Sequence, residues 1–177
     1  NKKEAINQIS SALLVAFFFL LFLTLAKFLV MDRTILPYLY PIAAFGLTIG
    51  LVFNLEFGIF STLLLVVLTV FGQTRSTELT LYYMLPTIAG MIALGKGRRV
   101  SSFLVTSLVV SLFSTLVILA FRLGDSTDWV GIATLVGAAL FNGIASGTFA
   151  LLLQNVFSYV LDVPTALQLM DISRPDH

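Results

Sequence analysis

The chain has 177 residues, of which 58% are hydrophobic and only 11% are charged, and its mean hydropathy is +1.02. A water-soluble domain carries about 25% charged residues, so this sequence cannot cover a water-facing surface and is typical of a chain that faces lipid. The net charge of +1 gives no indication of a nucleic-acid partner, and the absence of cysteine excludes disulfides and thiolate metal sites.

Six apolar stretches follow one another along the chain, each long enough, or nearly so, for a helix that crosses a membrane. A bilayer core about 30 Å thick requires roughly 20 helical residues. The apolar runs are continuous rather than alternating, which argues against a transmembrane barrel. The sequence therefore predicts an all-α fold, a polytopic transmembrane helix bundle of about six spans within residues 1–161. The predicted spans are residues 11–30, 38–53, 57–72, 79–95, 100–121 and 129–160.

Four of these spans have unusual lengths. The second, third and fourth are short. Only Asn54, Leu55 and Glu56 separate the second from the third, which favours a full hairpin over a re-entrant pair. The last span is too long, since 32 residues form a helix of about 48 Å. Tilt would absorb part of the excess, or the final turns extend into the cytoplasm. A split into two short helices at Asn142 and Gly143 is a weaker alternative.

Basic residues predict which side of the membrane each loop faces, because cytoplasmic loops are enriched in lysine and arginine. The loop between the fourth and fifth spans carries Lys96, Arg98 and Arg99 and no acidic residue, so we expect it in the cytoplasm. Counting spans from this loop places both the N- and C-termini in the cytoplasm. The loops on the other side are mixed or acidic, and they hold Asp32, Arg33, Arg75, Glu78, Arg122, Asp125 and Asp128.

Two pairs of glycines occur at a spacing of four residues inside predicted spans. Gly46 and Gly50 lie in the second span, and Gly143 and Gly147 lie in the sixth. Small residues at this spacing let helix backbones approach closely. We expect these glycines to serve helix packing within the bundle, with a contact in a homodimer as the alternative.

Two prolines and one amide are the other unusual residues at membrane depth. Pro41 and Pro86 lie inside or near the starts of the second and fourth spans, where each removes a backbone hydrogen bond. A static kink is favoured, and a hinge or an opening onto a ligand pocket is the functional alternative. Asn142 needs a hydrogen-bond partner in the middle of its span, and a neighbouring helix is favoured over a ligand. The sequence does not define any small ligand.

Charged side chains are scarce at membrane depth, where they would mark an ion or proton pathway. The ionisable groups nearest to the spans are Lys27, Glu56 and Arg122, all close to span ends, which argues against a proton-coupled transporter or an ion channel. His177 is the only histidine, and one histidine without cysteine does not form a usual zinc or di-iron site. We therefore expect no catalytic, cofactor-binding or metal-binding residue in this segment.

Several short motifs occur in a distinctive order along the chain. Pro-Tyr-Leu-Tyr-Pro-Ile-Ala-Ala begins at Pro37, the basic loop follows at residues 96–99, and Asn-Gly-Ile-Ala-Ser-Gly covers residues 142–147. The tail, residues 164–177, contains Thr-Ala-Leu-Gln-Leu and then Ser-Arg-Pro-Asp-His. These features resemble the membrane part of the bacterial seven-transmembrane HD-domain phosphohydrolases, whose linker has a Thr-x-Leu-x-Leu-like run before Ser-x-Pro-x-His.

The resemblance implies a larger protein in the bacterial plasma membrane. Members of that family carry an extracellular domain, seven spans and a cytoplasmic HD domain that hydrolyses cyclic di-AMP with a divalent metal pair. Residues 162–177 would then be a cytoplasmic linker, with Pro164 and Thr165 as its signal-carrying residues. The HD domain, with its metal ligands, would follow His177. The chain itself would anchor the protein in the lipid bilayer, sense a stimulus and transmit it to the HD domain.

A different class of membrane protein is the alternative. Substrate-binding subunits of small-molecule importers of the vitamin type, and cell-shape scaffold proteins, are also small helical bundles with few charges. The predicted spans contain no strongly polar site for a solute, which disfavours the importer, although apolar vitamins require few charges.

Overall fold

The computed structural model describes residues 2–97, 99–125 and 128–161, and helices make up most of this part of the chain. Within this part there is no β-strand, and the all-α prediction is confirmed. The helices are α1 (Lys2–Val30), α2 (Leu36–Leu39), α3 (Ile42–Val52), α4 (Leu55–Val70), α5 (Ser76–Leu94), α6 (Val100–Arg122) and α7 (Trp129–Leu161), with a 3-10 turn at Leu123–Asp125.

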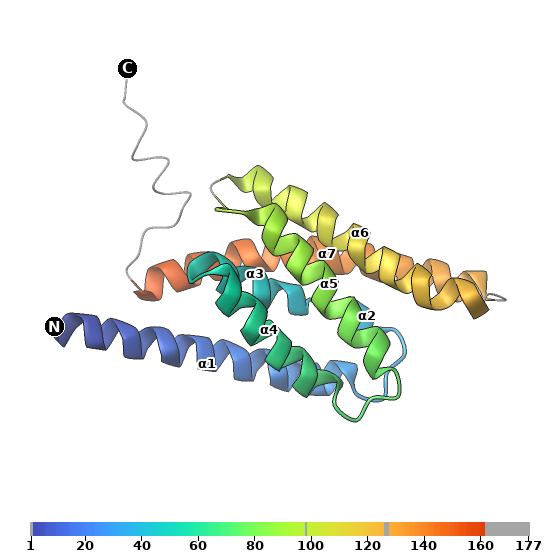
Figure 1. Cartoon of the computed structure of the whole chain (residues 1–177), viewed down its shortest axis with the longest axis horizontal. Helices are drawn as coiled ribbons and strands as arrows, with labels where there is room; N and C mark the ends of the chain where they lie inside the picture. Colours follow the sequence, from blue (N-terminus) through green and yellow to red (C-terminus); the bar gives the residue numbers. More distant parts are fainter. Residues whose placement is uncertain (1, 98, 126–127, 162–177) are drawn as a thin grey trace, which may run out of the picture.

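The helices run back and forth between two ends of the molecule (Figure 1). The start of α1, the α3–α4 turn, the α5–α6 loop and the last turns of α7 gather at one end, here called the basic end because Lys96 and Arg99 lie there. The α1–α2, α4–α5 and α6–α7 connections lie at the opposite end. Helix α7 packs along α6 and α3, α5 packs against α6 and α3, and α1 lies at the edge of the bundle.

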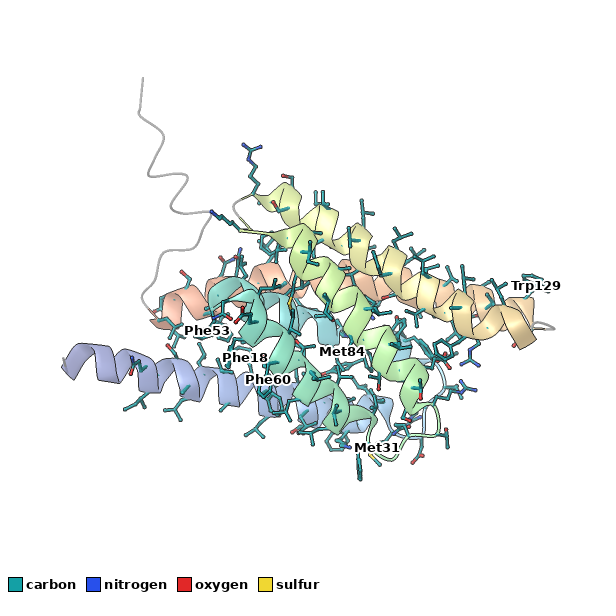
Figure 2. All side chains as sticks on the ribbon, in the orientation of Figure 1. Phe18, Met31, Phe53, Phe60, Met84 and Trp129 are labelled. Carbon is teal, nitrogen blue, oxygen red and sulfur yellow. The ribbon has the colours of Figure 1, made fainter. Side chains whose placement is uncertain are left out.

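Large apolar side chains cover the outside of the bundle (Figure 2). Phe28, Phe71 and Val130 are 76%, 78% and 78% exposed, whereas many serine and threonine side chains are buried between the helices. A surface of this kind is favourable against lipid and unfavourable against water. Three helical stretches are long and apolar enough to cross a membrane, namely Gln8–Val30, Val100–Arg122 and Trp129–Leu161, and Leu36–Val52 and Leu55–Val70 are shorter apolar stretches.

The second predicted span is interrupted, which corrects the expectation of one helix over residues 38–53. Helix α2 ends at Leu39 and α3 begins at Ile42, with Pro41 as the residue that precedes the new helix. Proline has no backbone N–H and disfavours helical geometry in the residue before it, so the break falls at Tyr40 and Pro41. The eleven residues of α3 cover only about 16 Å.

The tight turn after α3 has the geometry that the hairpin prediction requires. The Asn54 side chain accepts a hydrogen bond from the Phe57 backbone N–H at 2.7 Å and so caps the start of α4. Helices α3 and α4 then pack against each other and run in opposite directions (Figure 1).

Helix α7 is a single helix of 33 residues, so the alternative of two short helices that meet at Asn142 and Gly143 is wrong. At 1.5 Å per residue it is about 50 Å long, which is longer than a bilayer core of about 30 Å. The helix therefore runs the whole length of the bundle (Figure 1).

Candidate functional site

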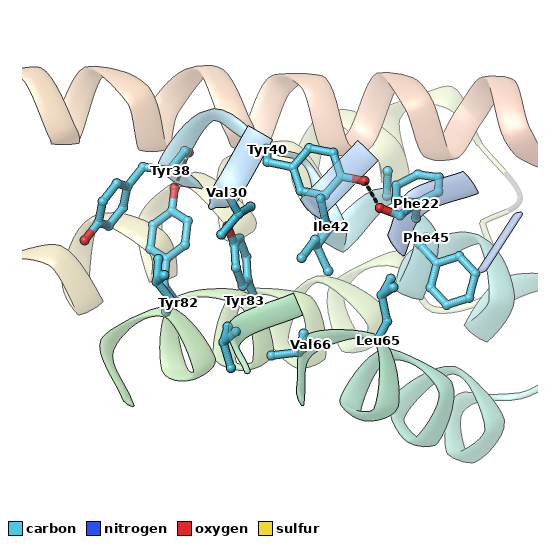
Figure 3. Close-up of a cluster of buried hydrophobic side chains, with 14 of the residues drawn as sticks. Phe22, Val30, Tyr38, Tyr40, Ile42, Phe45, Leu65, Val66, Tyr82 and Tyr83 are labelled. Atoms are coloured by element: carbon cyan, nitrogen blue, oxygen red, sulfur yellow. Dashed lines mark hydrogen bonds between the residues drawn. The ribbon is translucent and has the colours of Figure 1, made fainter. Parts of the chain in front are cut away.

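Tyrosine side chains fix the interrupted segment around α2 to its neighbours (Figure 3). The Tyr40 hydroxyl donates a hydrogen bond to the Phe22 carbonyl oxygen of α1 at 2.7 Å. From α5, the Tyr82 hydroxyl donates to the Tyr38 carbonyl oxygen at 2.7 Å, and the Tyr83 hydroxyl donates to the Pro37 carbonyl oxygen at 2.6 Å. The break at Tyr40 and Pro41 interrupts the helical hydrogen bonds of the Pro37 and Tyr38 carbonyl groups, and the two tyrosines of α5 satisfy them inside an apolar bundle.

A partly buried ion pair lies beside this segment at the opposite end of the bundle. Arg122 Nη2, from α6, lies 3.0 Å from Glu78 Oε1 and 3.2 Å from Glu78 Oε2, which belong to α5. The same nitrogen donates to the Tyr38 hydroxyl at 3.1 Å, and that hydroxyl donates to Glu78 Oε1. The side chains of Glu78 and Arg122 are 9% and 25% exposed. Three elements, α2, α5 and α6, thus share one charged contact.

The hydrogen bonds continue from this ion pair to the middle of α7. Asn142 Nδ2 donates to the Tyr82 hydroxyl at 3.1 Å, and the Ser146 hydroxyl donates to Asn142 Oδ1 at 3.1 Å. Asn142, Ser146 and Tyr82 are all buried. We call the whole set the polar network; it comprises Tyr38, Glu78, Tyr82, Arg122, Asn142 and Ser146.

The network is suited to hold helices in one arrangement. Buried polar groups are costly when they lose a partner, so a change at one member affects the others. Ionisable groups within membrane domains are expensive and mark functional sites. Among the described residues, no group of three or more histidine, cysteine, aspartate or glutamate side chains could hold a metal ion. The hydrogen bonds of the network join α2, α5, α6 and α7, so the positions of these helices depend on one another.

The four predicted glycines all lie where helices of this chain touch each other. A Cβ atom on Gly143 would lie 2.6 Å from the Ser107 carbonyl oxygen of α6, and one on Gly147 would lie 2.9 Å from the Phe103 carbonyl oxygen. A Cβ on Gly46 would lie 2.5 Å from Thr87 of α5. Gly50 lies in close contact with α4, because a Cβ atom on Gly58 of that helix would lie 2.6 Å from the Gly50 Cα. These surfaces are occupied within the chain.

The remaining predicted site residues are spread over the molecule. Pro41 lies at the α2–α3 break, and Pro86 is buried within the continuous helix α5. Lys96 and Arg99 are exposed in the loop at the basic end. Arg98, Pro164 and Thr165 lie outside the described residues.

Sequence reasoning missed Glu78. It was expected in a water-exposed loop, and only Lys27, Glu56 and Arg122 were considered as charges near spans. The structure instead has Glu78 buried in the first turn of α5. Its burial is tolerated because Arg122 and Tyr38 supply hydrogen bonds to the carboxylate. The available signal was that Glu78 and Arg122 lie near the same end of two adjacent antiparallel spans.

The fold and the network define a polytopic helical membrane domain. The chain belongs to the family described as "7TM receptor with intracellular HD hydrolase", whose family model matches residues 1–165. The cyclic-di-AMP phosphodiesterase PgpH of Bacillus subtilis (strain 168) is 28% identical over 155 residues, which are 83% of this chain and 22% of PgpH. The chain thus spans about a fifth of the length of this curated relative. No solved structure matches the chain.

Membership in this family confirms the resemblance that the sequence motifs indicated. It favours a membrane domain associated with an HD hydrolase over the importer and scaffold alternatives.

Proposed function

We propose that residues 1–161 form the membrane-anchoring, sensing and signal-transmitting domain of a phosphodiesterase that hydrolyses cyclic di-AMP in its HD domain. The observation that carries the proposal is the geometry of α7. One unbroken helix receives the polar network at Asn142 and continues to Leu161 at the basic end. A helix of this kind connects a change deep in the bundle to whatever follows it.

The family and the relative support the remaining parts of the proposal. The family pairs this membrane domain with an intracellular HD hydrolase, and the relative is a cyclic-di-AMP phosphodiesterase. We place the protein in a bacterial inner membrane with its basic end in the cytoplasm, since Lys96, Arg98 and Arg99 lie in the loop there. The HD domain would follow residue 177, reached through the linker with Pro164 and Thr165, and would bind a divalent metal pair with its own residues.

In the proposed mechanism, a stimulus changes the contacts of the polar network. Helix α7 then shifts against α6. The two helices are in close contact through small residues such as Gly143 and Ser107. A tightly packed contact of this kind changes between discrete arrangements rather than gradually. The shift reaches Leu161 because the helix is continuous. A two-state change in helix position is the physical element that such coupling requires.

The test uses the full-length protein with cyclic di-AMP and Mn²⁺. We expect Asn142→Leu to change the hydrolysis rate roughly two- to thirty-fold, because the residue at position 142 of α7 loses its hydrogen bonds to Tyr82 and Ser146. This change corresponds to a coupling free energy of about 0.5–2 kcal/mol. Two glycines inserted after Leu161 should leave basal hydrolysis intact and make Asn142→Leu silent, because the stiff connection is gone. A chelator should abolish hydrolysis in every variant.

Two outcomes would contradict the proposal in different ways. Absence of cyclic di-AMP hydrolysis by the metal-loaded protein would remove the substrate assignment. If Asn142→Leu left the hydrolysis rate unchanged both with and without the insertion, the proposed signal transmission through α7 would be contradicted.

A further inference from the structure

A cleft of about 1050 Å³ lies at the basic end, away from the polar network. The first half of α1, the α3–α4 turn, the start of α4 and the last turns of α7 form its walls. Cavities of roughly 300–1,000 Å³ are typical of sites that bury an organic ligand. Most of the lining is apolar, including Val15, Phe19, Phe57, Phe60, Phe157 and Leu161; Figure 2 labels Phe53 and Phe60, which also belong to the lining.

The polar groups of the cleft include two hydrogen-bond donors of particular interest. Gln154 lines it and is only 3% exposed, and its buried side-chain nitrogen Nε2 has no hydrogen-bond partner among the described residues. Lys96 lines the same cleft from the exposed α5–α6 loop. None of the described residues that line the cleft is acidic. A buried unpaired donor is unfavourable, so an acceptor oxygen is the chemical complement of this site.

We propose that this cleft binds an anionic phospholipid of the adjacent leaflet. Its acyl chains pack against the phenylalanine and leucine side chains, its phosphate pairs with Lys96, and an ester or phosphate oxygen accepts the hydrogen bond of Gln154. Basic pockets between transmembrane helices on the cytoplasmic side have this chemistry. That the leaflet is the cytoplasmic one rests on the proposed function, whereas the binding itself does not.

Occupancy of the cleft bears directly on α7. Gln154, Phe157 and Leu161 are residues of its last two turns, so a bound lipid holds this end of the helix against α1 and α4. A lipid that binds the folded state also stabilises it. Lipid composition would thereby set the position of the helix that leaves the bundle.

Native mass spectrometry of the full-length protein in detergent tests the proposal, with phosphatidylglycerol and phosphatidylcholine of identical acyl chains as probes. We expect phosphatidylglycerol to be retained in preference to phosphatidylcholine. Lys96→Gln should weaken its binding about fivefold, and Gln154→Leu about two- to tenfold. The matched control is Arg99→Gln, because Arg99 is exposed in the same loop and does not line the cleft. Equal losses in Lys96→Gln and Arg99→Gln, or equal retention of both lipids, would overturn the proposal.

A second pair of variants tests the cleft by shape rather than by charge. Ala16 lines the cleft on α1, whereas Leu13, on the same helix, is 65% exposed and does not. Ala16→Trp should expel phosphatidylglycerol and Leu13→Trp should not, with thermal unfolding to show that both variants are folded. Unchanged lipid binding in Ala16→Trp would overturn the proposal. The same spectra report whether the protein is a dimer. If Ala16→Trp abolished a dimer but still bound phosphatidylglycerol, the proposal would also be overturned, because the cleft would then bind a second copy of the chain.

Discussion

Glu78 and Arg122 bring opposite charges together between α5 and α6 in an otherwise apolar molecule. The carboxylate is nearly buried, whereas the guanidinium group is a quarter exposed, so water compensates only Arg122 when the pair is broken. Removal of one partner from a fully buried pair costs about 3–5 kcal/mol. Because Arg122 is partly exposed, removal of one partner of this pair should cost less than that.

We expect Glu78→Gln to lower the free energy of unfolding by about 1–3 kcal/mol, because Arg122 and Tyr38 lose their charged acceptor. Denaturant unfolding of the purified protein in detergent measures the change. Arg75→Gln is the control, since Arg75 is exposed next to the start of α5 and should change stability by less than about 0.5 kcal/mol. The variant with both Glu78→Gln and Arg122→Gln should cost less than the two single changes added together. Additive effects would show that the two side chains do not interact.

At the scale of helices, the contact between α6 and α7 depends on the absence of a side chain at Gly143. A Cβ there would lie 2.6 Å from both the carbonyl oxygen of Ser107 and the backbone nitrogen of Ser111, so the two helices would have to move apart. Gly137 lies in the same helix, and a Cβ there would meet no neighbouring helix within 4 Å in the described part of the chain.

This difference gives a matched pair of substitutions. Gly143→Ala should destabilise the protein by about 1–3 kcal/mol through overpacking. Gly137→Ala should be neutral or stabilising by up to about 1 kcal/mol, because alanine favours the helix over glycine. Thermal unfolding of both variants under identical conditions measures the contrast. If Gly143→Ala were as stable as Gly137→Ala, the close approach of α6 and α7 would not be present in the protein.

Apart from the interruption of the second predicted span, the helices themselves were predictable from sequence, and their partners were not. Continuous apolar runs identify membrane helices because lipid leaves the backbone no other way to satisfy its hydrogen bonds. The break at Pro41 could have been predicted from the chemistry of proline. The tyrosines that donate hydrogen bonds to the carbonyl groups beside the break could not, because they belong to a different helix, α5. Glu78 and Asn142 have partners 44 and 60 residues away in sequence, and periodicity within one span carries no information on such pairs.

At the scale of the whole molecule, the two ends differ in the chemistry that they present. The basic end contains the loop with Lys96 and Arg99 and the cleft with Gln154. The opposite end contains the Glu78–Arg122 pair and the segment around α2. If the basic end faces the cytoplasm, the Glu78–Arg122 pair lies toward the outside of the cell and the cleft with Gln154 lies toward the cytoplasm.

Cysteine labelling tests this orientation, because the chain contains no cysteine. Thr74→Cys lies in the exposed α4–α5 connection, and Ser101→Cys lies exposed at the start of α6 near the basic loop. In protoplasts with the full-length protein, freed of any other cysteine, we expect a membrane-impermeant maleimide to label Thr74→Cys directly and Ser101→Cys only after lysis. The reverse pattern would invert the topology, and labelling of both sites in intact protoplasts would contradict the bundle of alternating spans. In either case the basic loop would not face the cytoplasm, and α7 could not carry a signal to an intracellular HD domain.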